Sequence, residues 1–546
     1  MSRATHTVTN QVPDLGDYNL FLSDVVLRDA VRREAAESYW DVLSQYGHQL
    51  GRQEMFRLAH QVNRYKPELE QFDRQGRRLD RVRFHPGWHE FMRIAFAQGM
   101  HSSAWAMPGP GAHVARAAAY LMHGQVEAGS LCPTTMTAAA IPLLQKESWF
   151  ELVSSHLYSR QYDERDEPLA GKQAMMVGMG MTEKQGGSDL RSNLTTAEPL
   201  AQGGRGTPYR LRGHKWFFSA PTSDAHLVLA QHDGSFSCFY VPRWLDDGSR
   251  NAIYIQRLKD KLGNVSNASA EVEFDDAMGI LVAEEGRGIA ALVEMAGYTR
   301  LDCVLGSAAL LRQALVQALH HAHHRQAFGK YLVQQPLMQA VLADLALESE
   351  AATVLSLRLA RANDKPNALL DQAYRRILTP AAKFWVCKRS IAAIAECLEV
   401  WGGNGYVEEG PMARFYREAP VNSVWEGSGN IMCLDVLRAV NRHPELGEAL
   451  LASLEDHAAS EPLLKPRTRR LANRLRSGDS SLEASSRYLA RELVLLVQAG
   501  LLCQHAPDTV AQAFIRSRLH ADSAGAFGIE VPVSASSFLL DRAWLH

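Results

Sequence analysis

Three features are missing from this sequence: a long apolar run, an excess of charge of one sign, and a patterned set of cysteines. The most apolar stretch near the C-terminus, residues 493–503, is interrupted by Gln498 and is too short to span a bilayer. Residues 1–11 have no apolar segment behind Arg3, so we expect no secretory signal. The formal net charge of -2 excludes a global attraction to nucleic acid or to anionic membranes. We therefore expect no membrane partner, and any nucleic-acid binding needs a local patch.

The cysteines form neither a disulfide framework nor a zinc-binding pattern. There are seven of them, an odd number, and no two make a C-x-x-C pair. Scattered cysteines are typical of reduced thiols in a cytoplasmic protein, and we expect no metal site. They are Cys132, Cys238, Cys303, Cys387, Cys397, Cys433 and Cys503.

Hydrophobic periodicity divides the chain into four regions. A length of 546 residues accommodates three or four domains of ~150 residues each. Residues 22–158 have helical periodicity, residues 172–282 have β-type runs separated by Asp-Gly turns, and residues 288–440 and 445–546 are again helical. We expect strands at 209–211, 226–230, 236–241 and 270–274, and long helices at 308–324 and 338–361.

Two motifs in the β region suit a planar, charged ligand. Residues 179–189 (MGMTEKQGGSD) place two glycines and Ser188 in a turn after a strand, where backbone N–H groups can reach an anion or a flavin edge. Residues 213–220 (GHKWFFSA) contain three consecutive aromatics, more than strand alternation requires, and some could stack on a ring. An ordinary turn is the alternative for the first motif, and core packing is the alternative for the second.

Two glycine-containing motifs follow in the helical region. Arg325, Phe328 and Gly329 come after a long helix and could clamp a phosphate and a ring. A helix end with a glycine cap would look the same. The paired glycines of residues 399–406 (EVWGGNGY) allow close backbone approach, but they also suit a plain loop.

Residues 424–431 (VWEGSGNI) open a helix whose first N–H groups can hold a pyrophosphate or a ribityl oxygen. Glu426 stands beside the apolar Trp425, and burial there would raise the pKa of its carboxyl towards that of a proton-abstracting base. The alternative is a glutamate that the helix dipole favours at an N-terminus.

The order of these motifs, with Lys-Leu-Gly at 261–263, resembles the acyl-CoA dehydrogenase superfamily over about residues 100–440. The resemblance implies an α+β, mostly α fold: an N-terminal helical domain, a central β-barrel and a C-terminal helical bundle, here with an additional C-terminal helical domain. The corresponding ranges are 1–171, 172–285, 286–444 and 445–546. It also implies FAD as the cofactor, an acyl-CoA ligand and a homotetramer.

The resemblance places Glu426 at the catalytic base, with Arg300 near it. A structural salt bridge to Asp302 or another neighbour is the alternative for Arg300. The arginine and phenylalanine of the third motif would reach FAD on a neighbouring subunit. The implied FAD contacts are Met181, Thr182, Gly187, Ser188, Phe217, Phe218, Ser219, Arg325, Phe328, Glu399, Gly403, Trp425, Gly427, Ser428 and Asn430.

Three positions depart from the family pattern around the flavin. Phe217 stands where ordinary members have Trp, and Pro336 and Glu399 stand where they usually have Gln. The contacts that the usual residues make there are therefore in doubt.

Longer segments resemble one branch of this family, the flavoproteins of the bacterial adaptive response to DNA alkylation. They include residues 72–86 (FDRQGRRLDRVRFHP), 123–133 (HGQVEAGSLCP) and 420–438 (PVNSVWEGSGNIMCLDVLR). This resemblance implies binding of double-stranded DNA, protection of that DNA from alkylating agents, and at most weak acyl-CoA dehydrogenase activity.

Residues 465–476 (KPRTRRLANRLR) supply a basic patch on a chain that is otherwise balanced in charge. If Pro466 starts a helix, the arginines fall on one half of it and Leu471 and Leu475 on the other. Such a ridge suits DNA phosphates with little sequence readout, although a solvated amphipathic helix is the alternative. The candidate DNA-binding residues are Lys465, Arg467, Arg469, Arg470, Arg474 and Arg476, extended by Arg438, Arg442, Arg516 and Arg518.

Three functions are consistent with these patterns. The first is an FAD protein that binds and protects DNA. The second is a fully active acyl-CoA dehydrogenase with Glu426 as base, in which the last domain only builds the oligomer. The third is a flavin-dependent detoxifier of the alkylating agent itself.

Overall fold

The computed structural model describes residues 5–477, 482–519 and 525–545. The chain forms two compact units. The barrel unit comprises residues 57–302 and 426–428, and the helical unit comprises residues 1–56, 303–425 and 429–546. The finer division into four domains stays a prediction.

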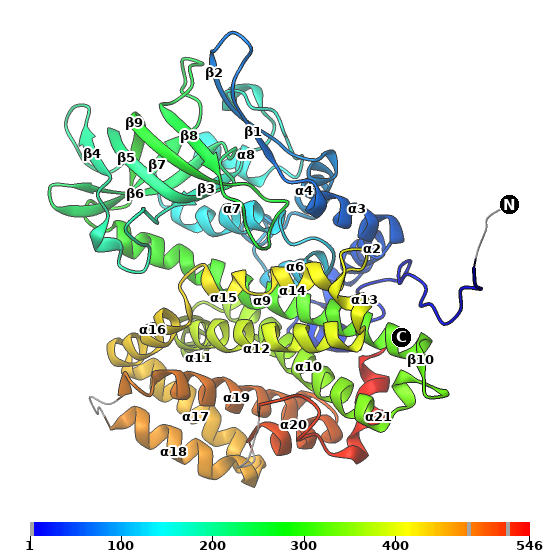
Figure 1. Cartoon of the computed structure of the whole chain (residues 1–546). Helices are drawn as coiled ribbons and strands as arrows, with labels where there is room; N and C mark the ends of the chain where they lie inside the picture. Colours follow the sequence, from blue (N-terminus) through cyan, green and yellow to red (C-terminus); the bar gives the residue numbers. More distant parts are fainter. Residues whose placement is uncertain (1–4, 478–481, 520–524, 546) are drawn as a thin grey trace. The chain divides into compact units, whose positions relative to one another are not determined.

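Seven strands form the main sheet of the barrel unit (Figure 1). Five of them close a ring in the order β6, β4, β5, β9 and β7, because β7 pairs with both β9 and β6. Strand β3 extends the ring from β6, and β8 extends it from β9. The strands are β3 (Val177–Gly180), β4 (Thr196–Pro199), β5 (Pro208–Ser219), β6 (Ala225–His232), β7 (Ser235–Pro242), β8 (Ile253–Leu258) and β9 (Ser269–Val282).

Alternation of side chains fills the inside of this ring. Tyr209, Phe218, Phe239 and Phe274 are buried in one core with aliphatic residues from the facing strands. The four expected strands lie within β5, β6, β7 and β9, so the predicted β-barrel is confirmed. Strands β4 and β8 were not predicted.

The region before the barrel is helical except for one hairpin. The expectation of helical structure over residues 22–158 is wrong at β1 (Glu68–Phe72) and β2 (Arg78–Arg83). Asp73 accepts hydrogen bonds from the N–H groups of Gln75 and Arg77, and Gly76 has a φ of 81°, which closes a turn that a helix cannot contain. The helices of this region are α3 (Gln53–Arg64), α4 (Pro86–Gln98), α5 (Ser103–Ala106), α6 (Ala112–Val126), α7 (Leu131–Leu144) and α8 (Glu151–Tyr158).

Long helices dominate the helical unit. The expected helices at 308–324 and 338–361 lie within α9 (Gly288–His324), which begins in the barrel unit, and α10 (Pro336–Asp364). Both are confirmed. The others up to residue 442 are α1 (Val25–Arg33), α2 (Trp40–Leu50), α11 (Leu369–Ala373), α12 (Thr379–Val400), α13 (Gly403–Tyr406), α14 (Met412–Glu418), α15 (Val421–Val424) and α16 (Gly429–Arg442).

The last hundred or so residues add a helical appendage, as predicted. Its central helix is α19, which packs against α10, α12 and α16 and buries the apolar run at 493–502. No helix in the described part of the chain combines the length and apolarity that crossing a membrane requires. The helices are α17 (Pro444–Ser460), α18 (Lys465–Arg476), α19 (Ser486–His505), α20 (Asp508–Leu519) and α21 (Val533–Ala543).

Candidate functional site

A buried ion pair fixes the glycine loop, which is the part of the 179–189 motif that follows β3. The ammonium of Lys215 donates to the Glu183 carboxylate at 2.7 Å, and neither side chain is exposed to solvent. Glu183 also accepts from the N–H groups of Leu194 and Thr195 at 2.6 and 3.1 Å. A Cβ at Gly187 would lie 2.4 Å from the Thr182 hydroxyl, so the close turn requires glycine.

Sequence reasoning missed this pair, although both residues lie inside the quoted motifs. Burial alone would raise the pKa of Glu183, but the charge of Lys215 and the N–H donors lower it. Burial lowers the pKa of Lys215 to about 8 against the opposing effect of Glu183. The pair is therefore ionised at neutral pH, and it connects the loop to β5.

A β-bulge explains the three consecutive aromatics of β5. The pairing with β9 shifts between Lys215 and Phe218, so Trp216 and Phe217 together occupy one position of the ladder. Phe217 is consequently 51% exposed, while Phe218 is buried in the core with its ring 3.8 Å from that of His226. Core packing, the alternative for this motif, is thus the role of the Phe218 side chain, and any stacking on a ring falls to its neighbours. Phe217 stays a candidate.

Glu426 lies on the short segment between α15 and α16, and contacts within the barrel unit hold it. Its carboxylate accepts a hydrogen bond of 2.6 Å from the Thr299 hydroxyl, and its backbone carbonyl accepts one of 3.1 Å from Arg300 Nε. Its φ is 59°, a left-handed conformation that is strained for a glutamate. Glu426 is half-buried in this chain.

Arg300 stands beside Glu426, as expected from its family position. The carboxylate of Asp302 accepts two hydrogen bonds from Arg116, at 2.7 and 2.8 Å, and a third from Thr135. Asp302 therefore pairs with Arg116. The salt bridge between Arg300 and Asp302, which was the alternative, is not formed.

Further side chains near Glu426 were not selected from the sequence. The thiol of Cys132 is buried beside Ser219 and Asn267, and burial raises its pKa to about 12 while the nearby charge of Lys261 opposes this and that of Glu426 adds to it. The amide of Asn267 is buried beside this thiol. The Lys-Leu-Gly motif at 261–263 was the one local signal for this cluster.

The barrel unit thus brings together Glu426, Arg300 and Ser219, which lie far apart in the sequence. Met181, Thr182, Gly187 and Ser188 lie on the glycine loop of the same unit, and Gly427 and Ser428 follow Glu426 directly. Phe217 and Phe218 also belong to this unit, and the remaining expected FAD contacts belong to the helical unit.

In the helical unit, Arg325 and Phe328 lie on the hairpin of β10 (Gln326–Ala327) and β11 (Lys330–Tyr331). Phe328 is 98% exposed at its tip with a φ of 53°, and Arg325 donates to the backbone carbonyl of Asn10. The structure is a hairpin here, not the helix cap that was the alternative.

Glu399 is exposed in the last turn of α12, and Gly403 opens α13. Trp425 accepts a hydrogen bond of 2.7 Å from Lys383 at its carbonyl and donates to Asn422 from its indole. Asn430 lies in the first turn of α16, where it accepts a hydrogen bond from Arg487.

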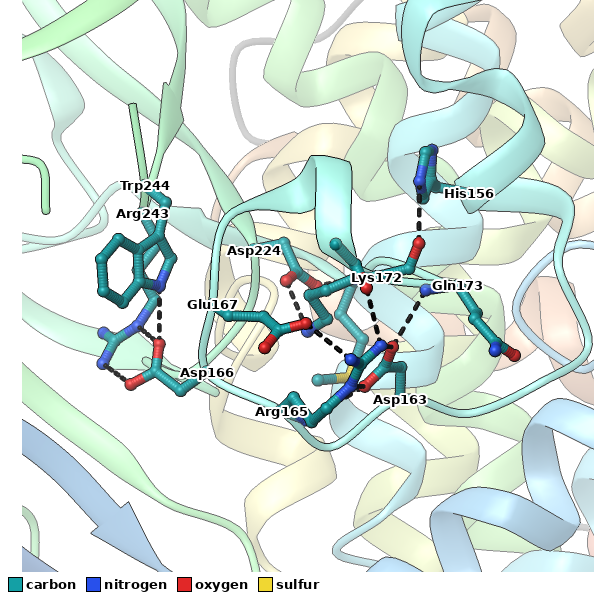
Figure 2. A network of polar contacts seen from close by, with 12 residues as sticks. His156, Asp163, Arg165, Asp166, Glu167, Lys172, Gln173, Asp224, Arg243 and Trp244 are labelled. Carbon is teal, nitrogen blue, oxygen red and sulfur yellow. Dashed lines mark hydrogen bonds and ion pairs between the residues drawn. The ribbon is translucent and has the colours of Figure 1, made fainter. Parts of the chain in front are cut away.

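A polar network fixes the loop between α8 and β3 in the barrel unit. Asp166 accepts hydrogen bonds from Arg243 and Trp244, each of 2.9 Å, and Figure 2 shows the three side chains together. On the same loop, Lys172 donates to the carboxylate of Asp224 at 2.7 Å. These side chains are occupied with one another, so the network serves the fold.

The basic helix of the sequence is α18, and Pro466 lies in its first turn as predicted. Thr468, Leu471 and Ala472 are buried on one side. Seven of the ten candidate cations are exposed and form no ion pair with any described residue. They are Lys465, Arg469, Arg470, Arg474, Arg438, Arg442 and Arg516.

Two of the candidate DNA-binding residues are misassigned, and a third is compromised. Arg518 has a side chain only 8% exposed and pairs with Asp344 and Glu348, so it cannot face DNA. Arg467 is paired with the buried Glu492 at 3.0 Å. Arg476 is exposed but pairs with Glu448 at 2.6 Å. The carboxylate partly offsets the attraction of this guanidinium for a phosphate.

Family models match three consecutive parts of the chain. The N-terminal domain of the adaptive response protein AidB matches residues 10–164, and the middle and C-terminal domains of acyl-CoA dehydrogenases match residues 178–277 and 286–441. The chain is 48% identical over 542 residues to the putative acyl-CoA dehydrogenase AidB of Escherichia coli K12, covering 99% of this chain and 98% of the relative. The chain belongs to the AidB family.

Other similar proteins place the AidB family within the acyl-CoA dehydrogenases, whose members typically bind FAD. Acyl-CoA dehydrogenase family member 11 of Caenorhabditis elegans is 27% identical over 530 residues, covering 90% of this chain and 85% of that protein. The apo form of Bd2924 has a TM-score of 0.83 at 27% identity and covers 91% of this chain and 100% of its own. The structure of C. elegans ACDH-11 in complex with C11-CoA shares the fold, with a TM-score of 0.84 at 24% identity and 96% of each chain covered.

Proposed function

We propose that this AidB-family chain carries FAD, binds double-stranded DNA and protects it from alkylation, with at most weak acyl-CoA dehydrogenase activity. We also propose that it acts in the cytoplasm as a homotetramer. The observation that carries the proposal is its near full-length identity of 48% to E. coli AidB. The human short-chain acyl-CoA dehydrogenase, in contrast, is 27% identical and covers 46% of this chain.

The barrel residues fit a flavin. A flavin ring offers acceptors, donors and a flat face, and the buried amide of Asn267 and the exposed ring of Phe217 are complementary to these. The glycine loop at 186–188 adds backbone groups that no side chain covers at Gly186, where a Cβ would meet nothing within 4 Å. We assign Thr182, Gly187, Ser188, Phe217 and Ser219 to FAD on these grounds.

FAD, when bound, accepts a hydride from the carbon next to the one that loses its proton. In this chain Glu426 is the group that takes that proton, at its carboxylate oxygens. Thr299 fixes the rotation of the carboxylate through the hydroxyl bond, and Arg300 fixes the backbone by holding the Glu426 carbonyl. The φ of Glu426 is left-handed, and its carboxylate is bonded to Thr299 within the barrel unit.

For DNA, the support is the exposed face of α18. Arg469, Arg470 and Arg474 are exposed on one helix and have no carboxylate partner among the described residues. Guanidinium groups release counterions when they meet phosphates, which makes such binding depend strongly on salt.

The test is a salt series of fluorescence anisotropy titrations with a labelled duplex. Replacing Arg469, Arg470 and Arg474 together with Gln should weaken binding and lower the slope of log K against log salt by about 0.9 for each phosphate that is no longer neutralised. Lys365→Gln, an exposed charge change between α10 and α11, is the control and should leave the titration unchanged. Equal affinity and slope in the triple variant would remove α18 from the DNA site.

A fully active acyl-CoA dehydrogenase is the second candidate, favoured by the hydrogen-bonded Glu426. Its test is anaerobic mixing with a panel of acyl-CoAs while flavin absorbance is followed. Fast bleaching that Glu426→Gln abolishes would support this activity, and no bleaching with any acyl-CoA would reject it. Neither result decides the DNA titration, so the two functions are tested separately.

A further inference from the structure

The helical unit contains a cavity of about 240 Å³ with four arginines in its wall. None of the residues expected to contact FAD or an acyl-CoA lines it. The side chains come from α10, α12, α18, α19 and α20, and from the segment before α21. Those that carry the argument are Asp344, Trp385, Arg389, Arg467, Arg491 and Arg518.

Two of these arginines share one buried carboxylate. Glu348 accepts from Arg389 at 3.1 Å and from Arg518 at 3.2 Å. Arg518 also pairs with Asp344, and its side chain is 8% exposed. A guanidinium held by two carboxylates on α10 cannot swing away, so its remaining N–H groups have fixed directions.

The other two arginines repeat the arrangement on the opposite helices. Glu492 of α19 accepts from Arg467 of α18 at 3.0 Å and from Arg491 at 2.9 Å. The carboxylate is 2% exposed and is shared between two cations. The wall is therefore preorganised before any ligand enters.

Three N–H donors in this wall have no acceptor. Arg491 Nε, Arg518 Nε and Trp385 Nε1 are buried, and each lacks a hydrogen-bond partner. The carboxylates of Asp344 and Glu530 also line the cavity but leave these three donors unsatisfied. Buried donors in native proteins are almost always paired. These three donors therefore favour the binding of a molecule that is rich in hydrogen-bond acceptors.

We propose that this cavity binds a small phosphate-bearing ligand. A tetrahedral oxyanion presents acceptors in several directions, and the three free donors come from three different helices, α12, α19 and α20. Arginine forks match phosphate oxygens in geometry and in charge. The volume lies below the roughly 300–1,000 Å³ of pockets for drug-sized ligands, so the cavity accommodates a phosphate with a small organic group.

Arg467 and Arg518 thus belong to the wall of this cavity, and their role is separate from DNA binding. A duplex is far too wide for a cavity of this volume, so the ligand is a small molecule and not the DNA backbone. Binding would bridge α12, α19 and α20, and would stabilise the appendage against the long helices.

The experiment is a calorimetric titration of inorganic phosphate into the full-length, FAD-loaded protein, with chloride keeping the ionic strength constant. Wild-type protein should bind phosphate saturably. Trp385→Phe removes one donor and keeps the ring, and Arg491→Gln removes a second. Each should weaken phosphate binding at least about tenfold, or about 1.4 kcal/mol. Lys365→Gln, an exposed charge change outside the cavity, should bind as wild type.

Phosphate affinity that is equal in wild type and in both variants would overturn the proposal, because ordinary water would then satisfy the donors. No saturable heat beyond that of chloride would overturn it as well. Loss of phosphate binding when a duplex is added would show that the titrated phosphate occupies the DNA-binding surface and not this cavity, and would overturn the proposal. Circular dichroism verifies the fold of each variant, and if Arg491→Gln unfolds, Trp385→Phe decides.

Discussion

Thr299 is the residue through which the position of the candidate base can be changed without touching the base. Its hydroxyl lies 2.6 Å from the Glu426 carboxylate. A hydrogen bond to a charged group contributes about 1.5–3 kcal/mol, so Thr299→Val should slow anaerobic flavin reduction by an acyl-CoA roughly ten- to a hundredfold. The loss should appear in kcat more than in KM, because Thr299 orients the base.

Thr299→Ser keeps the hydroxyl and should restore most of the rate. Stopped-flow absorbance measures all three proteins under one set of conditions. A valine variant that reduces its flavin as fast as wild type would show that Thr299 does not position Glu426.

The buried ion pair of Glu183 and Lys215 should contribute measurably to the stability of the fold. Breaking a buried pair leaves an uncompensated charge, which costs about 3–5 kcal/mol. Glu183→Gln should therefore lower the free energy of unfolding by about that amount, measured by chemical denaturation. Lys184→Gln changes the exposed neighbouring lysine and should stay within about 0.5 kcal/mol of wild type. A Glu183 variant as stable as this control would contradict a structural role for the pair.

At the scale of elements, the sequence predicted the helices and strands whose own residues carry the periodicity. The helices α9 and α10 and four strands of the barrel follow from period and composition alone. The hairpin of β1 and β2 was missed because polar residues alternate there within a helical neighbourhood. The bulge in β5 was foreshadowed by three aromatics in a row, but only the pairing with β9 shows that Phe217 faces out and Phe218 faces in.

The site was predictable only where one segment carries it. Glu426 and the glycine loop stand out as motifs, whereas Thr299, Cys132 and Asn267 reach the same place from distant segments. No local pattern encodes that convergence. The same reason misplaced Arg467 and Arg518, since their partners Glu492 and Asp344 are 25 and 174 residues away.

The stability of the loop between α8 and β3, drawn in Figure 2, should depend on pH. Burial alone would raise the pKa of Asp166, but the bonds and charges of Arg243 and Arg250 hold it well below its ordinary value of 3.8. A folded-state pKa below the unfolded one stabilises the protein above the unfolded value, and this stability is lost as pH falls through the folded value. The contribution should therefore be complete at pH 6 and should decline below about pH 4.

Asp166→Asn should be less stable than wild type by about 2 kcal/mol at pH 7, with a difference that shrinks steadily on acidification. Urea denaturation at a series of pH values measures this. Asp41→Asn, at an exposed position on α2, serves as the control. A constant difference between Asp166→Asn and wild type from pH 7 to pH 3 would contradict the assignment.

At the scale of the whole molecule, the hairpin of β10 and β11 is costly for a lone chain. Phe328 is 98% exposed, and the nearby Leu337 is 86% exposed. Phe328 also has a φ of 53°, a conformation in which glycine or asparagine is much easier to accommodate than a bulky aromatic. An aromatic kept at such a position is expected to contact a partner surface, and we expect that partner to be a second copy of this chain.

The corresponding prediction concerns assembly. Phe328→Asn suits the backbone of the turn and removes the ring, so the variant should fold but sediment as a smaller species than wild type in analytical ultracentrifugation. Leu152→Asn changes an exposed leucine on α8, 76% exposed, and should keep the wild-type assembly. Because Arg325 lies on the same hairpin and is expected to reach FAD of the neighbouring subunit, the smaller species should also lose flavin on gel filtration. A Phe328 variant with wild-type mass and full flavin content would remove this hairpin from the subunit interface.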